Sequence, residues 1–568
     1  MKQSVGGMNY KRAVVVVAIG LLAYLFIGIG LTWPLLPNIG SAVISHWDID
    51  IVHSLWLQWW FEQAVLSSDR SLFTTNALHF PQTVDLQFAD LNLAYNSLFF
   101  FLSQLAGPTL AYNILTISSF IAAGGSVWWC CRQLGQSPTA SWFAGLVFAA
   151  SPYWLCSMLN AWIYLQHTWT LPLLIALFHR TATRGSPYSA PLLGLVWGMT
   201  FHITPYYFVF GGVILVALLP WYLVPHRRFT SQTKLTGSVL LAVAIAGLIV
   251  LPRAILMISQ ARGNFLVHHG PMNVELRARP LEFVLPSTST VVARTDSLGY
   301  LVVYLSYTVI GLLALTFLAA KRKHWTHMLP WLSTAGLMLV LALGPYLVIG
   351  ADTESDRILM PAYILQQLPV FRVTTNHWRW TLPAVLCLAI TVSIGLSHLS
   401  SMLQRYGIKP WVSPVLLSAI YLIEMVTVFP LPASKPIWPT RPAPIAQELY
   451  RRSDIQVIFD RTPRRKWHQV THGKRIVGGW LPRLDREVYA VSHDLENSIY
   501  RTQTADETHQ RLGSLGIDAM ILDGHRAVIV TRDPDHANRF AGELLVVESP
   551  SSGNEENAHE GISQHDDE

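Results

Sequence analysis

A series of long apolar runs is the feature that most constrains how this chain can fold. Each run has roughly 17–25 residues, enough for one helix to cross the ~30 Å hydrocarbon core of a bilayer. The runs fall near 13–33, 109–130, 140–157, 162–178, 187–203, 206–224, 236–258, 299–319, 328–349, 379–398 and 411–430. They predict an α-helical polytopic membrane protein with about eleven transmembrane helices.

The composition agrees with a lipid-facing surface. Of 568 residues, 51% are hydrophobic and 13% are charged, against about 25% charged in an average soluble protein. The 21 tryptophans suit the belts that amphipathic rings form at headgroup level. The first run follows Lys2, Lys11 and Arg12. It is longer than the apolar part of a cleaved signal, so we expect it to remain as an anchor.

The short loops predict the orientation. Basic residues gather in four of them, and an inside N-terminus places all four in the cytoplasm, as the positive-inside rule requires. These loops contain His179–Arg184, Arg227 and Arg228 with Lys234, Lys321–Lys323, and Arg405 with Lys409. This orientation requires 91–107 to be a juxtamembrane or re-entrant segment, and it places the C-terminal domain outside the plasma (inner) membrane.

Long outer loops divide the chain into predicted domains. Residues 1–431 form the transmembrane domain, whose outer loops span 34–108, 259–298 and 351–378. Loops of this length are uncommon unless they are functional or disordered.

A proline-rich linker follows 430, and residues 432–548 predict a small extracytoplasmic α/β domain. Its expected strands are Ile455–Phe459, Val488–Val491, Ala519–Leu522 and Ala527–Thr531, with helices near 494–515. The acidic tail 549–568 is predicted to be disordered.

The four cysteines, Cys130, Cys131, Cys156 and Cys387, lie within or at the ends of spans. We therefore expect no outer disulfide and no Cys-x-x-Cys metal site. Packing and palmitoylation are both open for Cys130 and Cys131.

Two acidic residues open the amphipathic part of the first outer loop. Asp48 and Asp50 follow His46, and Trp56, Trp59 and Trp60 come next. Such a carboxylate can act as general base on an acceptor hydroxyl, or help to hold a divalent cation. The alternative is a solvated turn with an Asp capping the following helix.

A cationic cluster precedes the tenth span. Arg372, His377 and Arg379 lie beside Trp378 and Trp380, on the side from which the positive-inside rule would exclude them. Arginine forks bind phosphate oxygens in bidentate fashion, which suits a lipid-linked phosphate. Interfacial snorkelling of single arginines is the alternative.

His167, His202 and Glu424 are further ionisable residues near outer span ends. Such groups are functional candidates, although each histidine could equally serve an interhelical hydrogen bond, and Glu424 could pair with Arg379 or Arg253. No nucleotide-binding or hydrolase motif stands in a supporting context. The net charge of +6 is accounted for by the cytoplasmic loops, so no nucleic-acid partner is expected.

In order along the chain, these features resemble the GT-C superfamily of polyprenyl-phosphate-dependent glycosyltransferases, particularly its poorly characterised bacterial branch. The resemblance covers roughly 13–530. It rests on Asp48–Asp50, Trp56–Trp60, Phe80-Pro81, Ala111–Asn113, Ala144–Tyr153, His167, Leu343–Pro345, Leu368-Pro369 with Arg372 and Arg379, and Gln469–Lys474 with Gly478–Trp480 and Arg483.

The resemblance implies an outer-face active site, a polyprenyl-phosphate sugar as donor, and a glycan, lipid or protein as acceptor. Asp48 would be the acidic residue of the first loop, whereas Arg372 and Arg379 are phosphate candidates on physical grounds. His46 and Trp47 stand where these enzymes often have a cleaner acidic pair, which leaves the use of Mg²⁺ or Mn²⁺ open. The resemblance also implies an inverting displacement at the anomeric carbon. In it, a carboxylate activates the acceptor hydroxyl and positive charge stabilises the departing lipid phosphate.

Two other functions compete with this one. A transporter or flippase for a lipid-linked sugar would also have many spans, but the hydropathy shows no internal repeat and no matched pair of broken helices. A non-catalytic envelope scaffold or glycan-binding protein would leave the aspartates without a chemical role.

Overall fold

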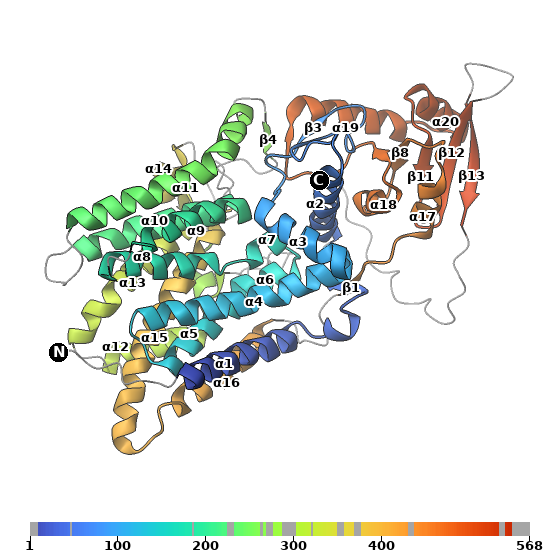
Figure 1. Cartoon of the computed structure of the whole chain (residues 1–568). Helices are drawn as coiled ribbons and strands as arrows, with labels where there is room; N and C mark the ends of the chain where they lie inside the picture. The colour runs from blue at the N-terminus through green and yellow to red at the C-terminus, as the bar shows by residue number, and fades with distance from the viewer. Residues whose placement is uncertain are drawn as a thin grey trace. The chain divides into compact units, whose positions relative to one another are not determined.

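The structure is a computed structural model. It describes residues 10–45, 48–184, 187–223, 232–261, 265–267, 277–286, 303–319, 322–348, 357–368, 376–429, 437–532 and 540–547. The chain divides into two compact units (Figure 1). The first unit comprises Met1–Asp69 and Leu86–Thr440, and the second comprises Arg70–Asp85 and Arg441–Glu568.

The first unit is a helical bundle. Its helices are α1 (Tyr10–Leu31), α2 (Asp48–Leu66), α3 (Leu93–Ala106), α4 (Pro108–Gln133), α5 (Pro138–Ala149), α6 (Pro152–Leu159), α7 (Ile163–Gln166), α8 (Thr170–Arg184), α9 (Ser189–Ile203), α10 (Pro205–Leu223), α11 (Gln232–Ala261), α12 (Tyr307–Ala319), α13 (Arg322–Ala342), α14 (Pro361–Gln366), α15 (Thr381–Leu403) and α16 (Val412–Val428). Short antiparallel pairs join β1 (Ala42–Ile44) to β7 (Ile437–Pro439) and β5 (Tyr346–Val348) to β6 (Arg357–Leu359).

Nine of the eleven predicted apolar runs each coincide with a single helix, and the other two are each divided between two helices. Within the described residues, six segments are long and apolar enough to cross a membrane by length and composition, namely Val14–Leu31, Pro108–Gln133, Pro138–Leu159, Pro205–Leu223, Gln232–Ser259 and His377–Tyr406. The total of about eleven crossings and their direction remain predictions.

Small residues allow close helix packing in the bundle. Gly194 and Gly198, four residues apart on α9, face α11 (Figure 1). A Cβ at Gly194 would lie 2.5 Å from the Ala242 carbonyl oxygen, and one at Gly198 would lie 2.8 Å from Ile249 Cβ. This spacing of small residues lets two backbones approach closely where van der Waals packing drives association in lipid.

Two predicted spans are interrupted. The run at 140–157 breaks between α5 and α6, where Pro152 lacks an N–H and the Ser151 hydroxyl caps α6 by accepting from the Trp154 N–H. The run at 162–178 breaks at His167, between α7 and α8. Non-helical backbone at membrane depth is tolerated where protein buries it, and residues 150–161 are buried throughout.

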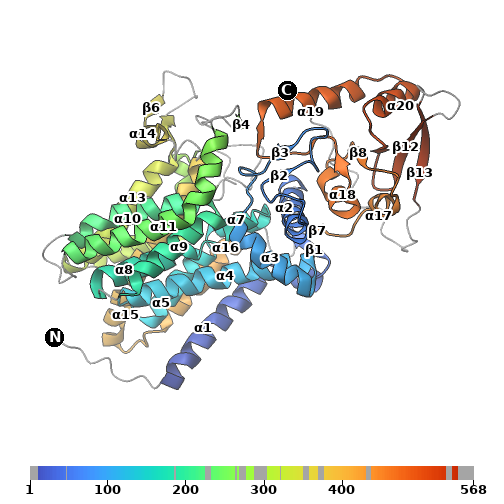
Figure 2. The ribbon, with the colours of Figure 1, turned by 45° about the horizontal axis from the view of Figure 1, so that its top comes forward.

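The second unit is an α/β domain. Its five-stranded sheet has the order β13 (Phe540–Val546), β12 (Arg526–Arg532), β11 (Ala519–Ile521), β8 (Val457–Asp460) and β9 (Arg475–Ile476) (Figure 2). The β11–β8 and β8–β9 pairs are parallel, and the other two are antiparallel. Its helices are α17 (Pro444–Arg451), α18 (Arg465–His472), α19 (Arg486–Tyr500) and α20 (Ala505–Ser514), and β10 (Arg483–Asp485) precedes α19.

The strand predicted at Val488–Val491 is wrong, because these residues lie inside α19. The Asp485 side chain accepts from the Glu487 N–H and so caps the helix. A cap of this kind fixes where the first helical turn begins, and it outweighs the β-propensity of a short Val-Tyr-Ala-Val run.

Part of the first predicted outer loop belongs to the second unit. Residues 70–85 include the strands β2 (Thr74–Thr75) and β3 (Val84–Asp85), which pair with each other. The Ile476 N–H donates to the Ala77 carbonyl at 2.9 Å, and the Phe80 N–H donates to the Ile476 carbonyl at 3.1 Å. The segment therefore pairs alongside edge strand β9.

Residues of α18 and of the segment after it hold residues 77–80. The Gln469 amide donates to the Ala77 carbonyl at 2.6 Å and to the Lys474 carbonyl at 2.9 Å. Gly479 has φ +119, and a Cβ there would lie 2.9 Å from Leu78 Cδ2. The Gln469–Trp480 signature thus has a structural explanation in the close approach of residues 77–80.

Candidate active site

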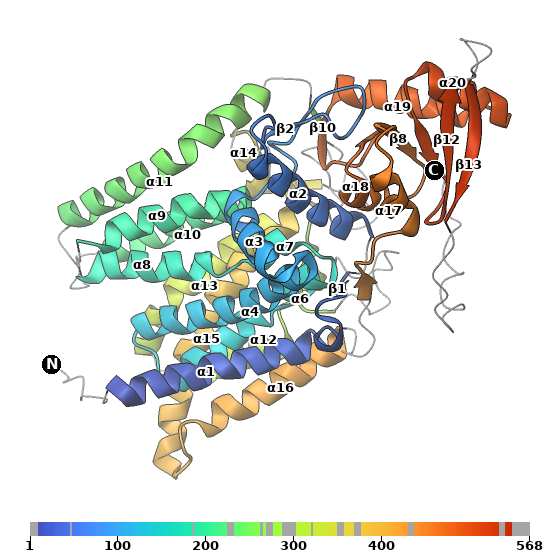
Figure 3. The same ribbon diagram turned by 45° about the vertical axis from the view of Figure 1, so that its right-hand side comes forward.

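Asp50 lies in the first turn of α2, which packs against α3 (Figure 3). Its carboxylate accepts a hydrogen bond of 3.0 Å from the Trp162 indole N–H, which comes from the break between α6 and α7. Although part of the side chain reaches the surface, protein surrounds the carboxylate. Burial is the main reason that the pKa of Asp50 is raised to about 6. The Asp90 charge acts in the same direction, whereas the Trp162 hydrogen bond and the Arg379 charge oppose it.

Asp90 supplies a second carboxylate close to Asp50. It occupies a left-handed conformation with φ 58°, which Asp tolerates better than most residues. Contacts on both sides hold its loop, since the His53 ring Nε2 lies 3.1 Å from the Ala89 carbonyl oxygen and Arg253 donates to the Leu91 carbonyl at 2.7 Å. The loop thereby brings a second acidic group within electrostatic range of Asp50.

Arg379 provides the first buried positive charge. It lies in a short 3-10 helix, His377–Trp380, that leads into α15, and it is 6% exposed. Its guanidinium stacks over the ring of Tyr206 at 4.4 Å and near that of Trp378 at 5.2 Å. The Nε–H has no hydrogen-bond partner within the described part of the chain, while Asp50 and Asp90 both lie within electrostatic range.

Arg253 provides the second buried positive charge of the site. It follows Pro252 inside α11, is 5% exposed, and interacts electrostatically with Asp90. One nitrogen donates to Leu91, but Nε and Nη1 have no partner among the described residues. Buried polar groups are almost always hydrogen-bonded. Unsatisfied donors on two arginines that both interact with Asp90 therefore indicate a place where an anionic ligand would complete their bonding.

Aromatic rings line the same region. Trp162 stacks on Trp378 with ring centroids 5.7 Å apart, and Tyr153 lies 5.8 Å from Trp378. Hydroxyls of Ser54 and Tyr112 both donate to the Ala161 carbonyl at 3.3 Å, which fixes the break that carries Trp162. The arrangement combines two carboxylates, two guanidiniums and apolar ring faces, so it can bind an anionic group and remove a proton beside it.

The structure locates some predicted site residues but not all of them. His46, Arg372 and the side chain of Asp48 lie outside the described residues. Asp50 and Arg379 are brought together. His377 is buried behind Arg379, with its Nε2 2.8 Å from the Gln366 amide nitrogen. His167 is buried with its ring 5.1 Å from that of Tyr95, and its Nε2 has no partner within the described residues.

His202 and Glu424 have structural contacts instead. The His202 Nε2 lies 3.2 Å from the Ile249 carbonyl oxygen, which links α9 to α11. Glu424 binds the start of α12, accepting from the Tyr304 hydroxyl at 2.6 Å and from the N–H groups of Tyr307 and Thr308 at 2.6 and 3.0 Å. Its contacts are thus with the orphan amides of a helix N-terminus, and not with Arg379 or Arg253 as the sequence suggested.

Sequence reasoning missed Asp90 and Trp162 and treated Arg253 only as a pairing partner. Asp90 is a single aspartate in a loop, and it forms no motif with other acidic or metal-binding residues in the sequence. Arg253 did carry a usable signal, because an arginine deep within an apolar run is a functional candidate by default.

A divalent cation is only partly matched by these residues. Among the described residues, no group of three or more His, Cys, Asp or Glu side chains could hold a metal ion. Asp50 and Asp90 are two carboxylates, the protein ligands that Mg²⁺ commonly uses together with substrate phosphates and waters, and Arg379 and Arg253 supply positive charge near Asp90.

The similarity of this chain to known proteins lies in its structure and not in its sequence. No protein-family model and no curated protein matches the chain in sequence. The fold is similar to that of the Archaeoglobus fulgidus oligosaccharyltransferase in its apo form, with a TM-score of 0.56, 9% identity, and coverage of 89% of this chain and 69% of that one. The same enzyme tethered to an acceptor peptide with the NVT sequon gives a TM-score of 0.50 at 11% identity, covering 90% of this chain and 69% of that one.

A third solved structure, the arabinofuranosyltransferase AftD from Mycobacteria, gives a TM-score of 0.51 at 13% identity. The match covers 91% of this chain but 35% of AftD, so this chain corresponds to about a third of that protein. These similarities show that the chain shares its fold with this oligosaccharyltransferase and this arabinofuranosyltransferase.

Proposed function

We propose that this protein is a membrane glycosyltransferase that moves a sugar from a polyprenyl-phosphate donor to an envelope glycan, lipid or protein acceptor on the outer face of the plasma membrane. The observation that carries this proposal is the site in which Asp50 and Asp90 face the buried guanidiniums of Arg379 and Arg253. Such a site offers a base and an anion-binding pair in one place, within a fold shared with glycosyltransferases.

Asp50 is the proposed general base. A catalytic base works best when its pKa lies near the working pH, and the raised pKa of about 6 meets this condition better than that of an ordinary surface aspartate. The Trp162 hydrogen bond holds one carboxylate oxygen, which leaves the other to take a proton. Asp48 remains a second acidic candidate in the same turn.

Arg379 and Arg253 are the proposed phosphate ligands. In the transfer step the acceptor oxygen bonds to the anomeric carbon as the bond from that carbon to the phosphate oxygen breaks. The acceptor proton moves to Asp50, and the electron pair leaves with the lipid phosphate. Fixed positive charge in a buried site stabilises the charge that develops on the leaving group without reorganisation.

The aromatic surface is the proposed sugar platform. Trp162 and Trp378 present stacked rings between Asp50 and Arg379, and apolar ring faces suit the C–H surface of a sugar.

The orientation of the chain in the membrane is predicted from the positive-inside rule. An engineered cysteine at Ser514 should accordingly be labelled by a membrane-impermeant reagent from outside intact cells, and labelling only after lysis would reverse the orientation.

The direct test is transfer in reconstituted vesicles. Purified full-length protein is mixed with radiolabelled polyprenyl-phosphate sugars and membrane acceptor fractions, and incorporation is followed for the wild type and for Asp50→Asn. We expect incorporation that depends on Asp50. Lipid-phosphate binding without transfer for any donor would favour the non-catalytic scaffold instead.

A further inference from the structure

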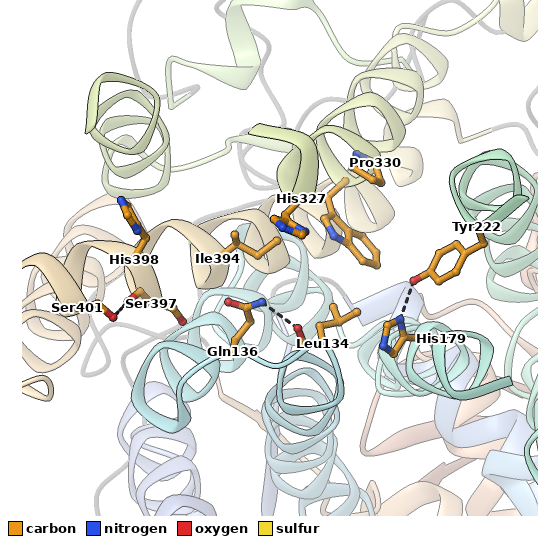
Figure 4. Close-up of a pocket in the computed structure, with 11 residues that line it drawn as sticks. Leu134, Gln136, His179, Tyr222, His327, Pro330, Ile394, Ser397, His398 and Ser401 are labelled. Carbon is orange, nitrogen blue, oxygen red and sulfur yellow. Dashed lines mark hydrogen bonds between the residues drawn. The ribbon is translucent and has the colours of Figure 1, made fainter. Parts of the chain in front are cut away.

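A cavity lies at the opposite end of α15 from the candidate active site. Its volume is about 420 Å³, within the range of small-ligand sites. Helices α8, α10, α13 and α15 and the turn between α4 and α5 supply its lining, which comprises Leu134, Gln136, His179, Tyr222, His327, Pro330, Trp331, Ile394, Ser397, His398 and Ser401 (Figure 4).

Helix lengths separate this cavity from the active site. Tyr112 and Arg379 lie near the starts of α4 and α15, whereas Leu134 and Ser401 lie at their ends. At 1.5 Å per residue, the 22 residues from Arg379 to Ser401 correspond to about 33 Å, about the thickness of the hydrocarbon core. The cavity and the active site therefore face opposite sides of the membrane.

Polar groups without a carboxylate line one part of the cavity. Three histidines, two serines, a tyrosine and a glutamine line it, and the lining residues described include no Asp or Glu. The His179 Nδ1 lies 2.9 Å from the Tyr222 hydroxyl oxygen, and the Ser401 hydroxyl donates to the Ser397 carbonyl at 2.8 Å (Figure 4). A lining without carboxylates, beside the guanidiniums of Arg184 and Arg132, favours an anionic ligand over a cation.

Positive charge surrounds the same helix ends. Arg184 ends α8 and lies within electrostatic range of His179. Arg132 ends α4 and donates to the Gln136 carbonyl, and Lys234 lies in the first turn of α11. These basic residues belong to the end of the bundle that the positive-inside rule predicts to be cytoplasmic.

Apolar groups complete the cavity. Leu134, Ile394 and Trp331 lie beside the polar donors, so an occupant would have both an anionic and a hydrocarbon part. His327 and Ser401 are exposed on α13 and α15, which opens the cavity to the surface at the depth of lipid headgroups. A free inorganic anion would leave the apolar part of the lining without a partner.

We propose that this cavity binds the phosphate headgroup of an anionic phospholipid from the cytoplasmic leaflet. The phosphate oxygens accept from the Arg184 and Arg132 guanidiniums beside the cavity, and the glycerol end of the acyl chains contacts Ile394 and Trp331. Basic pockets between transmembrane helices bind lipid headgroups by the same chemistry. This site is distinct from the proposed transferase site and does not rest on it.

The test measures binding to the full-length protein in a neutral detergent. Thermal unfolding is followed while phosphatidylglycerol, phosphatidylcholine with the same acyl chains, or inorganic phosphate is added. A ligand that binds the folded state raises Tm by mass action. We expect phosphatidylglycerol to raise Tm, and phosphatidylcholine and inorganic phosphate to leave it unchanged.

Two variants locate the binding. His327→Glu places a carboxylate at an exposed lining position, and Ser401→Leu fills the opening without changing charge. Each should raise the half-saturating concentration of phosphatidylglycerol about tenfold, as the loss of one charge-assisted contact would. Gln232→Glu is the matched control, because it adds the same charge at an exposed position near the end of α10 without lining the cavity, and it should bind as the wild type does.

Three results would overturn the proposal. Phosphatidylcholine has the same phosphate balanced by a choline cation, so equal stabilisation by it would show that the net negative charge of the headgroup is not recognised. Stabilisation by inorganic phosphate alone would indicate a soluble anion instead of a lipid. Unchanged affinity in both lining variants would place the lipid elsewhere. Because the readout is lipid binding, an inactive transferase would leave the outcome intact.

Discussion

Replacing Asp50 with Asn separates the chemistry of the proposed base from its structural contacts. Asn keeps the side-chain shape and an oxygen that can accept from the Trp162 indole, but it cannot take a proton from an acceptor hydroxyl. A general base contributes about 10²–10⁴-fold in rate. We therefore expect Asp50→Asn to lower kcat by at least about 10²-fold, with donor affinity close to that of the wild type.

The raised pKa of Asp50, about 6, also predicts how the wild-type rate depends on pH. Only the ionised carboxylate acts as a base, and a group with this pKa is about 90% ionised at pH 7 and about 10% ionised at pH 5. Wild-type kcat/KM should thus fall about tenfold between these pH values. The residual rate of Asp50→Asn should lack this acidic limb.

On acidification, the contribution of Asp50 to stability should become more favourable, whereas the activity should fall. Because the folded pKa of Asp50 lies above its ordinary value of 3.8, the folded state binds protons more readily than the unfolded chain does. The resulting penalty is fully present above about pH 6 and is absent below about pH 4. It amounts to at most about 3 kcal/mol, so Asp50→Asn should melt no lower than the wild type at pH 7, and any advantage should shrink on acidification.

The assay is sugar transfer in reconstituted vesicles, with thermal unfolding measured on the same preparations. Glu62→Gln is the matched control, since it removes a carboxylate from the same helix at a position that is hydrogen-bonded to Gln104. It should transfer normally. Full activity of Asp50→Asn, or loss of its activity only together with a lower Tm, would refute the assignment of Asp50 as the base.

Three further predictions concern the surrounding residues. Arg379→Ala should raise the KM for the polyprenyl-phosphate donor about 10–100-fold through loss of charge-assisted hydrogen bonds, and a donor titration that matches the wild type would exclude Arg379 from phosphate binding. Glu424→Gln should lower stability in thermal unfolding by about 1–3 kcal/mol, because Glu424 accepts from the amides that begin α12. The KM for the donor should not change, and a changed KM would place Glu424 in the site. Treatment with EDTA should leave transfer within about twofold, because Arg379 and Arg253 supply positive charge at the leaving phosphate, whereas loss restored by Mg²⁺ or Mn²⁺ would require a complete metal site.

The sequence by itself determined the membrane character of the chain and the approximate position of each apolar helix. Hydrophobic length is a local property, and a run of about 20 apolar residues has few alternatives to a helix in lipid. The cluster around Arg379 could also be found from the sequence alone, because its cationic and aromatic residues are adjacent in the chain. The strand at Val488–Val491 failed because a local β-propensity competed with a helix cap three residues earlier.

Tertiary structure alone decided which acidic residues share the site with Arg379. Asp48 and Asp50 are equivalent by composition, and only the break between α6 and α7 brings the Trp162 indole to Asp50. Asp90 and Arg253 reach the same place from a loop and from the interior of α11, through a left-handed residue and a hydrogen bond to Leu91. Contacts between residues this far apart depend on how helices pack and where they break, and no local pattern of residue types encodes either.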